Sequence, residues 1–283
     1  MDLRPRATRM SALPVVQREV DELVDDVLRD LPEREGLCGF AEEALDLGSD
    51  GASHRPFCST ICVVSGSAHA APETVRIASE GETLLGDLYG ALPSRRAAIL
   101  VHGQAWDASG WREVAEQFVS RGVPSLALNL RGYDGSSGKT NDFAPPAPWS
   151  PIADLRAAKA LLRERGAREI ALVGASMGGH AILASSFEAD VECIVSISAP
   201  VTPVPDELSR RITGRKLFVL ADDDRAPKGI APLAPNVLRC FDVASKPKTL
   251  LMFGGSEHSR GMFAAPYGPD VIEAIIEFVA RGT

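Results

Sequence analysis

The sequence contains few cysteines and no pair of them in the C-x-x-C spacing that is typical of zinc and redox sites. Of the five cysteines, Cys193 lies inside an apolar run, where a buried thiol is the simplest interpretation. The cysteines therefore predict neither a disulfide framework nor a metal site. We expect no cofactor.

Long apolar runs and an excess of positive charge are also missing. No stretch approaches the roughly 18 uninterrupted apolar residues that a membrane-spanning helix needs, so we expect no integral membrane segment. The formal net charge is -8. Because such an acidic surface repels phosphate backbones, the charge argues against a nucleic-acid partner.

The length of 283 residues and the 45% hydrophobic composition suit one catalytic-size domain with an extension. We expect an N-terminal extension at residues 1–72 and the domain at 73–283. Within the extension, apolar residues recur at spacings of three and four over residues 14–31, with acidic residues between them. That pattern predicts an amphipathic helix that ends before Pro32, followed by a linker.

Residues 57–71 combine a short apolar run with Ala68-His69-Ala70, a small-x-small pattern that resembles a secretory cleavage site. The stretch lies far from Met1, so a linker or an extra strand is the preferred interpretation, and we expect a cytoplasmic protein. The alternative is export, if translation starts internally and this stretch is a leader.

From Thr74 onward the pattern is that of an α/β domain. Two alternating segments, 74–78 and 83–91, predict an antiparallel hairpin. Apolar runs then alternate with helical stretches, which predicts a doubly wound, mostly parallel sheet. The predicted strands are 97–101, 123–130, 169–173, 191–198, 216–220 and 248–253, and the predicted helices are 110–121, 151–165, 177–187 and 269–280.

The strand at 169–173 runs into Gly174-x-Ser176-x-Gly178. This G-x-S-x-G pattern between a strand and a helix is typical of a nucleophile elbow, a sharp turn that exposes a serine hydroxyl at the edge of a parallel sheet. A serine needs a general base, and His258 follows the last strand, at the edge where ligands bind in such sheets. We therefore predict Ser176 as nucleophile and His258 as base.

The order of elements, together with four motifs, resembles the α/β-hydrolase family over residues 74–283. The motifs are His102-Gly103, the Asn129–Ser136 segment, the serine turn, and an acid followed by a histidine after later strands. Two features depart from the family pattern. Asn129 stands where the family often has Asp, and Tyr133-Asp134 adds one residue to the R-G-x-G-x-S pattern. Only residues 199–215 separate the strands predicted at 191–198 and 216–220, which is too short for the helical lid that many relatives insert there. In this respect the chain resembles the dienelactone-hydrolase-like and small carboxylesterase branches, which have no large cap.

The resemblance implies a carboxylesterase-like serine hydrolase that cleaves a small acyl substrate through an acyl-enzyme. It favours Asp224 as the triad acid, although Asp222 and Asp223 stay open as alternatives. It also implies an oxyanion hole formed by the backbone N–H groups of Gln104 and Met177.

Aromatic residues near the predicted site suggest how an acyl or alcohol group is bound. Trp106 and Trp149 are candidates for a substrate pocket, and ordinary packing is the competing interpretation. Thioesterase, peptidase and cofactor-free perhydrolase chemistry would use the same triad. A non-catalytic binding protein with this fold is the alternative from a different functional class.

Overall fold

The computed structural model describes residues 71–140, 150–186, 191–225 and 232–281. These residues belong to one compact unit within residues 69–283. The predicted helix at 14–31, the small-residue pattern at 68–70 and Trp149 lie outside the described residues.

The chain enters the sheet as an antiparallel hairpin, β1 (Glu73–Ser79) and β2 (Glu82–Tyr89). Glu80 and Gly81 form the turn between them with positive φ angles of 46° and 86°, the conformation that two-residue hairpin turns favour. Burial alternates along β1, as expected for a strand with one face on the core.

The remaining strands pair parallel to one another, and β2 joins them through an antiparallel contact with β4. The order across the eight-stranded sheet is β1-β2-β4-β3-β5-β6-β7-β8. The parallel strands are β3 (Arg96–Val101), β4 (Ser125–Leu128), β5 (Glu169–Ala175), β6 (Cys193–Ile197), β7 (Arg215–Ala221) and β8 (Lys248–Phe253). The predicted doubly wound, mostly parallel sheet with an N-terminal antiparallel hairpin is confirmed.

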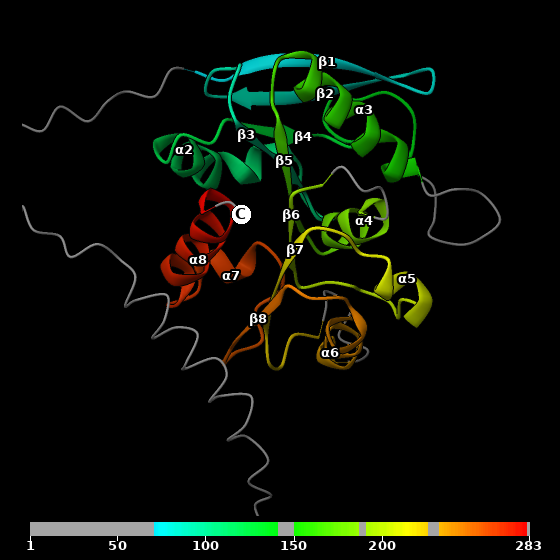
Figure 1. Cartoon of the computed structure of the whole chain (residues 1–283), viewed down its shortest axis with the longest axis vertical. Coiled ribbons are helices and arrows are strands. Elements are labelled where there is room, and N and C mark those ends of the chain that lie inside the picture. Colours follow the sequence, from blue (N-terminus) through cyan, green and yellow to red (C-terminus); the bar gives the residue numbers. More distant parts are fainter. Residues whose placement is uncertain (1–70, 141–149, 187–190, 226–231, 282–283) are drawn as a thin grey trace, which may run out of the picture. The chain divides into compact units, whose positions relative to one another are not determined.

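Helices cover both faces of this sheet (Figure 1). One apolar layer contains side chains of α2 (Arg112–Ser120), α7 (Gly261–Ala264) and α8 (Gly268–Ala280), and the short helix η1 (Ala108–Trp111) joins it. The other layer contains side chains of α3 (Ser150–Glu164), α4 (Met177–Ser185) and α6 (Ala234–Val243). Between β6 and β7 the chain forms only the five-residue helix α5 (Asp206–Arg210).

The structure differs from the sequence expectation in a few elements. β4 is shorter than the predicted strand 123–130, because the N–H of Val123 donates to Phe118 O and closes α2. Helices α5, α6 and α7 were not predicted. Within the described ranges, no helix is long and apolar enough to cross a membrane.

Two arginines fix the end of α8 at the amino-terminal edge of the sheet. Arg96, which is 7% exposed, donates to the carbonyls of Val279 and Ala280 at 2.8 and 2.9 Å. Arg215 donates to the carbonyl of Phe278 at 3.0 Å. Cations at a helix C-terminus donate to its last carbonyls and are attracted to the negative end of its dipole. Both arginines are the first residues of their strands, so these contacts lie at the edge opposite the carboxyl ends of the strands.

Candidate active site

Ser176 lies at the turn between β5 and α4, with φ 53° and ψ -116°. An L-residue rarely adopts such a positive φ, so this backbone is strained. The flanking glycines make the turn possible. A Cβ on Gly174 would lie 2.5 Å from the Gly178 carbonyl oxygen, and a Cβ on Gly178 would overlap the carbonyl oxygen of Val101. The G-x-S-x-G spacing therefore follows from close packing of the turn against β3.

Three of the side chains predicted for the site meet at the carboxyl edge of the sheet. Nε2 of His258 lies 2.8 Å from Oγ of Ser176. Nδ1 of His258 lies 2.8 and 3.0 Å from the two carboxylate oxygens of Asp224. Asp224 is fully buried, whereas the His258 side chain is 14% exposed. The arrangement joins a hydroxyl, an imidazole and a shielded carboxylate by hydrogen bonds.

The three adjacent acids after β7 have different surroundings. Oδ1 of Asp222 accepts the N–H of Gly255 at 2.9 Å, which ties the β7 turn to the loop after β8. Asp223 is exposed and forms an ion pair with Arg225 at 3.0 Å. Only Asp224 of the three contacts His258 in the described structure.

Residues that the sequence did not single out hold the His258 loop. The N–H of Ser259 donates to Oγ of Ser198 at 2.9 Å, and both serines have positive φ angles. The hydroxyl of Tyr267 donates to Glu257 at 2.7 Å, and its ring stacks on Phe253 with centroids 4.9 Å apart. The only sequence signal for Ser198 is its position directly after β6.

The loop after β3 lies against the serine. A Cβ on Gly103 would lie 3.3 Å from Cβ of Ser176 and 2.6 Å from Nε1 of Trp106. Gln104, which follows Gly103 in the chain, is exposed. Met177, which follows Ser176, is buried. The loop therefore brings the chain at Gln104 close to the nucleophile turn.

Buried His102 connects this loop to the one after β4. Its Nδ1 donates to the Gly103 carbonyl at 2.9 Å, since a carbonyl can only accept, and its Nε2 accepts the N–H of Leu130 at 3.2 Å. Burial lowers the pKa of His102. A neutral imidazole with one fixed tautomer is therefore part of the framework around the serine.

Aromatic side chains surround the same loop. Trp106 is half-buried, with its ring 5.2 Å from Trp111 and the guanidinium of Arg260 5.6 Å from its centroid. Tyr133, which the sequence did not assign to the site, packs 4.4 Å from His102 and places its hydroxyl 3.7 Å from the Met177 sulfur. Trp106 thus packs beside the loop that follows β3, and its role as a pocket wall stays a prediction.

Two further polar groups are wholly or partly buried in the described structure. Arg131 and Asp154 form a buried pair at 2.6 Å, and Oγ of Ser79 donates to the same carboxylate at 2.8 Å. Burial lowers the pKa of His180, one turn into α4, to about 4. Among the described residues, no group of three His, Cys, Asp or Glu side chains could hold a metal ion.

Comparison with solved structures reveals similar folds at low sequence identity. A predicted CIB-like hydrolase from Thermoplasma acidophilum has a TM-score of 0.61 at 17% identity, over 74% of this chain and 98% of that one. The Pyrococcus furiosus esterase Pf2001 has a TM-score of 0.60 at 17% identity, over 75% and 92%. Epoxide hydrolase A from Mycobacterium thermoresistibile has a TM-score of 0.57 at 17% identity, over 75% and 99%.

Comparison by sequence gives a family match but no individual relative, because none of the curated proteins matches the chain. The family model described as "Alpha/beta hydrolase family" matches residues 98–275. This range runs from β3 into α8 and contains the serine turn, the acidic run and the His258 loop. With more than half of its length matched, the chain belongs to the alpha/beta hydrolase family.

Proposed function

We propose that the protein is a serine hydrolase that cleaves carboxylic esters through an acyl-enzyme, with Ser176, His258 and Asp224 as its triad. The observation that carries the proposal is the continuous hydrogen-bond path from Ser176 Oγ through His258 to Asp224, at 2.8 Å for each link. Such a path lets the imidazole take the serine proton while the carboxylate stabilises the imidazolium.

In the first half-reaction, Oγ of Ser176 attacks the ester carbonyl carbon as its proton moves to Nε2 of His258. The carbonyl oxygen becomes an oxyanion, which the backbone N–H groups of Met177 and Gln104 bind. Met177 is the first residue of α4, where helical N–H groups have no intrahelical acceptor and the dipole favours negative charge. His258 then donates its proton to the leaving alcohol.

In the second half-reaction, water attacks the acyl group on Ser176. His258 accepts a proton from this water and returns a proton to Oγ of Ser176 when the carboxylic acid leaves. We expect Trp106 and Tyr133, whose rings both pack beside His102, to contact the acyl or alcohol group.

The identity of residue 176 separates esters from epoxides. One structurally similar protein is an esterase and another is an epoxide hydrolase. The family resemblance associates epoxide opening with an aspartate nucleophile, whereas this turn carries a serine. Acyl transfer to water is therefore the chemistry that these side chains support best.

A substrate panel tests the proposal. Purified full-length protein is assayed with aryl esters of increasing acyl length, the matching thioesters and an aryl epoxide, in parallel with Ser176→Ala. We expect ester hydrolysis that Ser176→Ala abolishes and no epoxide opening. Thioester cleavage at higher kcat/KM than the matched esters would replace the ester assignment with a thioesterase, and equal activity of Ser176→Ala would refute the triad.

A further inference from the structure

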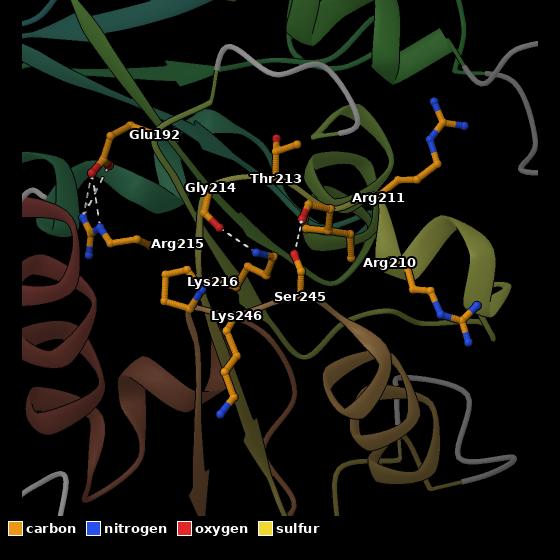
Figure 2. A pocket seen from close by; sticks show the side chains of 11 residues that line it. Glu192, Arg210, Arg211, Thr213, Gly214, Arg215, Lys216, Ser245 and Lys246 are labelled. Atoms are coloured by element: carbon orange, nitrogen blue, oxygen red, sulfur yellow. Dashed lines mark hydrogen bonds and ion pairs between the residues drawn. The ribbon is translucent and has the colours of Figure 1, made fainter.

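A groove with a volume of about 680 Å³ lies at the amino-terminal ends of β6, β7 and β8 (Figure 2). Ser176, Asp224 and His258 all follow the carboxyl ends of strands, so the groove is at the opposite edge of the sheet. Its volume is within the usual range for small-molecule sites. Its charged lining consists of Arg210, Arg211, Arg215, Lys216, Lys246 and Glu192.

The single carboxylate in this lining is already paired. Glu192 binds Arg215 at 3.1 Å and also lies 3.7 Å from Arg96. In Figure 2 the Glu192–Arg215 pair lies to one side of Lys216, and Arg210 and Arg211 extend on the other. The groove therefore keeps a strong positive charge on a chain whose formal net charge is -8.

Lys216 is the most unusual of these cations, because it is 1% exposed. Its ammonium donates to the carbonyl of Gly214 at 2.6 Å, and no carboxylate in the described part of the chain lies within ion-pair distance. Burial, together with the charge of Lys248, lowers the pKa of Lys216. A buried ammonium without a counter-ion is costly.

The neighbouring lysine, Lys248, has a more favourable environment for its charge. Lys248 lies beside Lys216 in the β7–β8 register, and its ammonium donates to the carbonyls of Phe241 and Asp242 at 2.6 and 2.8 Å. These carbonyls form the C-terminus of α6, whose dipole favours a cation. Lys248 thus has a structural partner, whereas Lys216 has one carbonyl and a like charge beside it.

We propose that this groove binds a small phosphate-bearing ligand, whose phosphate contacts the exposed cations of the groove and offsets the charge of the buried Lys216 ammonium beneath them. A phosphate carries more than one negative charge and several acceptor oxygens, which suits a site with multiple cations better than a single carboxylate does. Exposed Arg210 and Lys246 at the groove provide the remaining donors. The site is independent of ester hydrolysis, because it shares no residue with the proposed triad.

Calorimetry and thermal unfolding of the full chain test the proposal, with inorganic phosphate and pyrophosphate as probes and chloride at matched ionic strength as reference. We expect saturable binding of pyrophosphate, with an increase in Tm that chloride does not produce. Vesicles of phosphatidylcholine with and without phosphatidate distinguish a lipid headgroup from a free phosphate as the source. Binding of succinate as tightly as pyrophosphate would overturn the assignment of phosphate.

Lys216→Met separates a ligand site from a structural lysine. We expect this variant to have an unchanged or higher Tm without ligand and a pyrophosphate Kd at least about tenfold weaker. Lys139→Met removes an exposed lysine outside the groove and should bind as wild type does. If Lys216→Met does not fold, the double variant Arg210→Gln with Lys246→Gln replaces two exposed cations and should weaken binding.

Two results would overturn the site: no saturable binding of phosphate or pyrophosphate beyond the chloride reference, or wild-type affinity in the folded groove variants. Ser176→Ala should bind the anions as wild type does. A failed anion site and a failed esterase assignment are therefore distinguishable.

Discussion

The carboxylate of Asp224 is fully buried and lies with its two oxygens 2.8 and 3.0 Å from Nδ1 of His258. Asp223, one residue earlier, is exposed and pairs with Arg225 instead. Adjacent carboxylates in one turn therefore have separate surroundings, and these provide matched variants for testing the role of the acid.

Asp224→Asn should reduce kcat for an aryl ester by about 10³-fold or more, because an amide cannot hold the required imidazole tautomer or stabilise the imidazolium. Asp223→Asn should leave kcat within about twofold, as expected for an exposed pair. Steady-state kinetics on both variants, with circular dichroism to verify folding, make the comparison. Similar losses in the two variants would contradict the assignment of Asp224.

Gly103→Ala should lower kcat by about tenfold or more, because the new Cβ would lie 2.6 Å from Trp106 and 3.3 Å from Ser176 and would displace the loop that leads to Gln104. Gly254→Ala is the control, since its Cβ would meet nothing within 4 Å. Unchanged kcat in folded Gly103→Ala would show that the position of this loop is unimportant for the reaction.

Asp154→Ala should lower the free energy of unfolding by about 3–5 kcal/mol, because it leaves the buried guanidinium of Arg131 with only the exposed carboxylate of Glu80, at 3.8 Å, as a counter-ion. The exposed Arg165–Glu73 pair offers a comparison, and Glu73→Gln should lower the free energy of unfolding far less than Asp154→Ala does. Urea unfolding measures both values. A loss below about 1 kcal/mol for Asp154→Ala would mean that the buried pair contributes little.

His180 should make the protein less stable in acid. Its pKa is lowered from 6.5 to about 4 in the folded protein, so the unfolded chain binds more protons between these values. The lowered pKa of His180 therefore does not reduce the free energy of unfolding above about pH 6.5. It reduces this free energy by about 3 kcal/mol as the pH falls from about 6.5 to about 4. His180→Leu should flatten the slope in this window, as urea titrations at a series of pH values would measure. An unchanged slope would contradict the shift.

Much of the fold could be predicted because its signals are local. Continuous apolar runs indicate the parallel strands, and the glycines around Ser176 indicate the strained turn between β5 and α4. Helix α6 was missed because prolines precede it and Pro235 lies in its first turn, where proline in fact fits a helix. Its apolar residues, such as Val237 and Cys240, pack in the core layer, but the helix spans only ten residues.

The site could be predicted only in part, since some of its contacts join residues that are far apart in the chain. Three successive acids look alike in sequence, and only the turn after β7 determines that Asp224 faces His258. The support of the His258 loop by Ser198, and the contact of Tyr133 with Met177, depend on how the strands are ordered. Trp149 and the amphipathic helix at 14–31 remain predictions outside the described residues.

The most direct test of the central claim is covalent labelling of the nucleophile. A fluorophosphonate probe is incubated with the full-length protein, and the modified peptide is identified by mass spectrometry. We predict a single adduct on Ser176 that forms together with loss of ester hydrolysis and is absent from Ser176→Ala. Labelling that persists in folded Ser176→Ala, or an active protein that the probe does not modify, would contradict the assignment of Ser176 as the nucleophile.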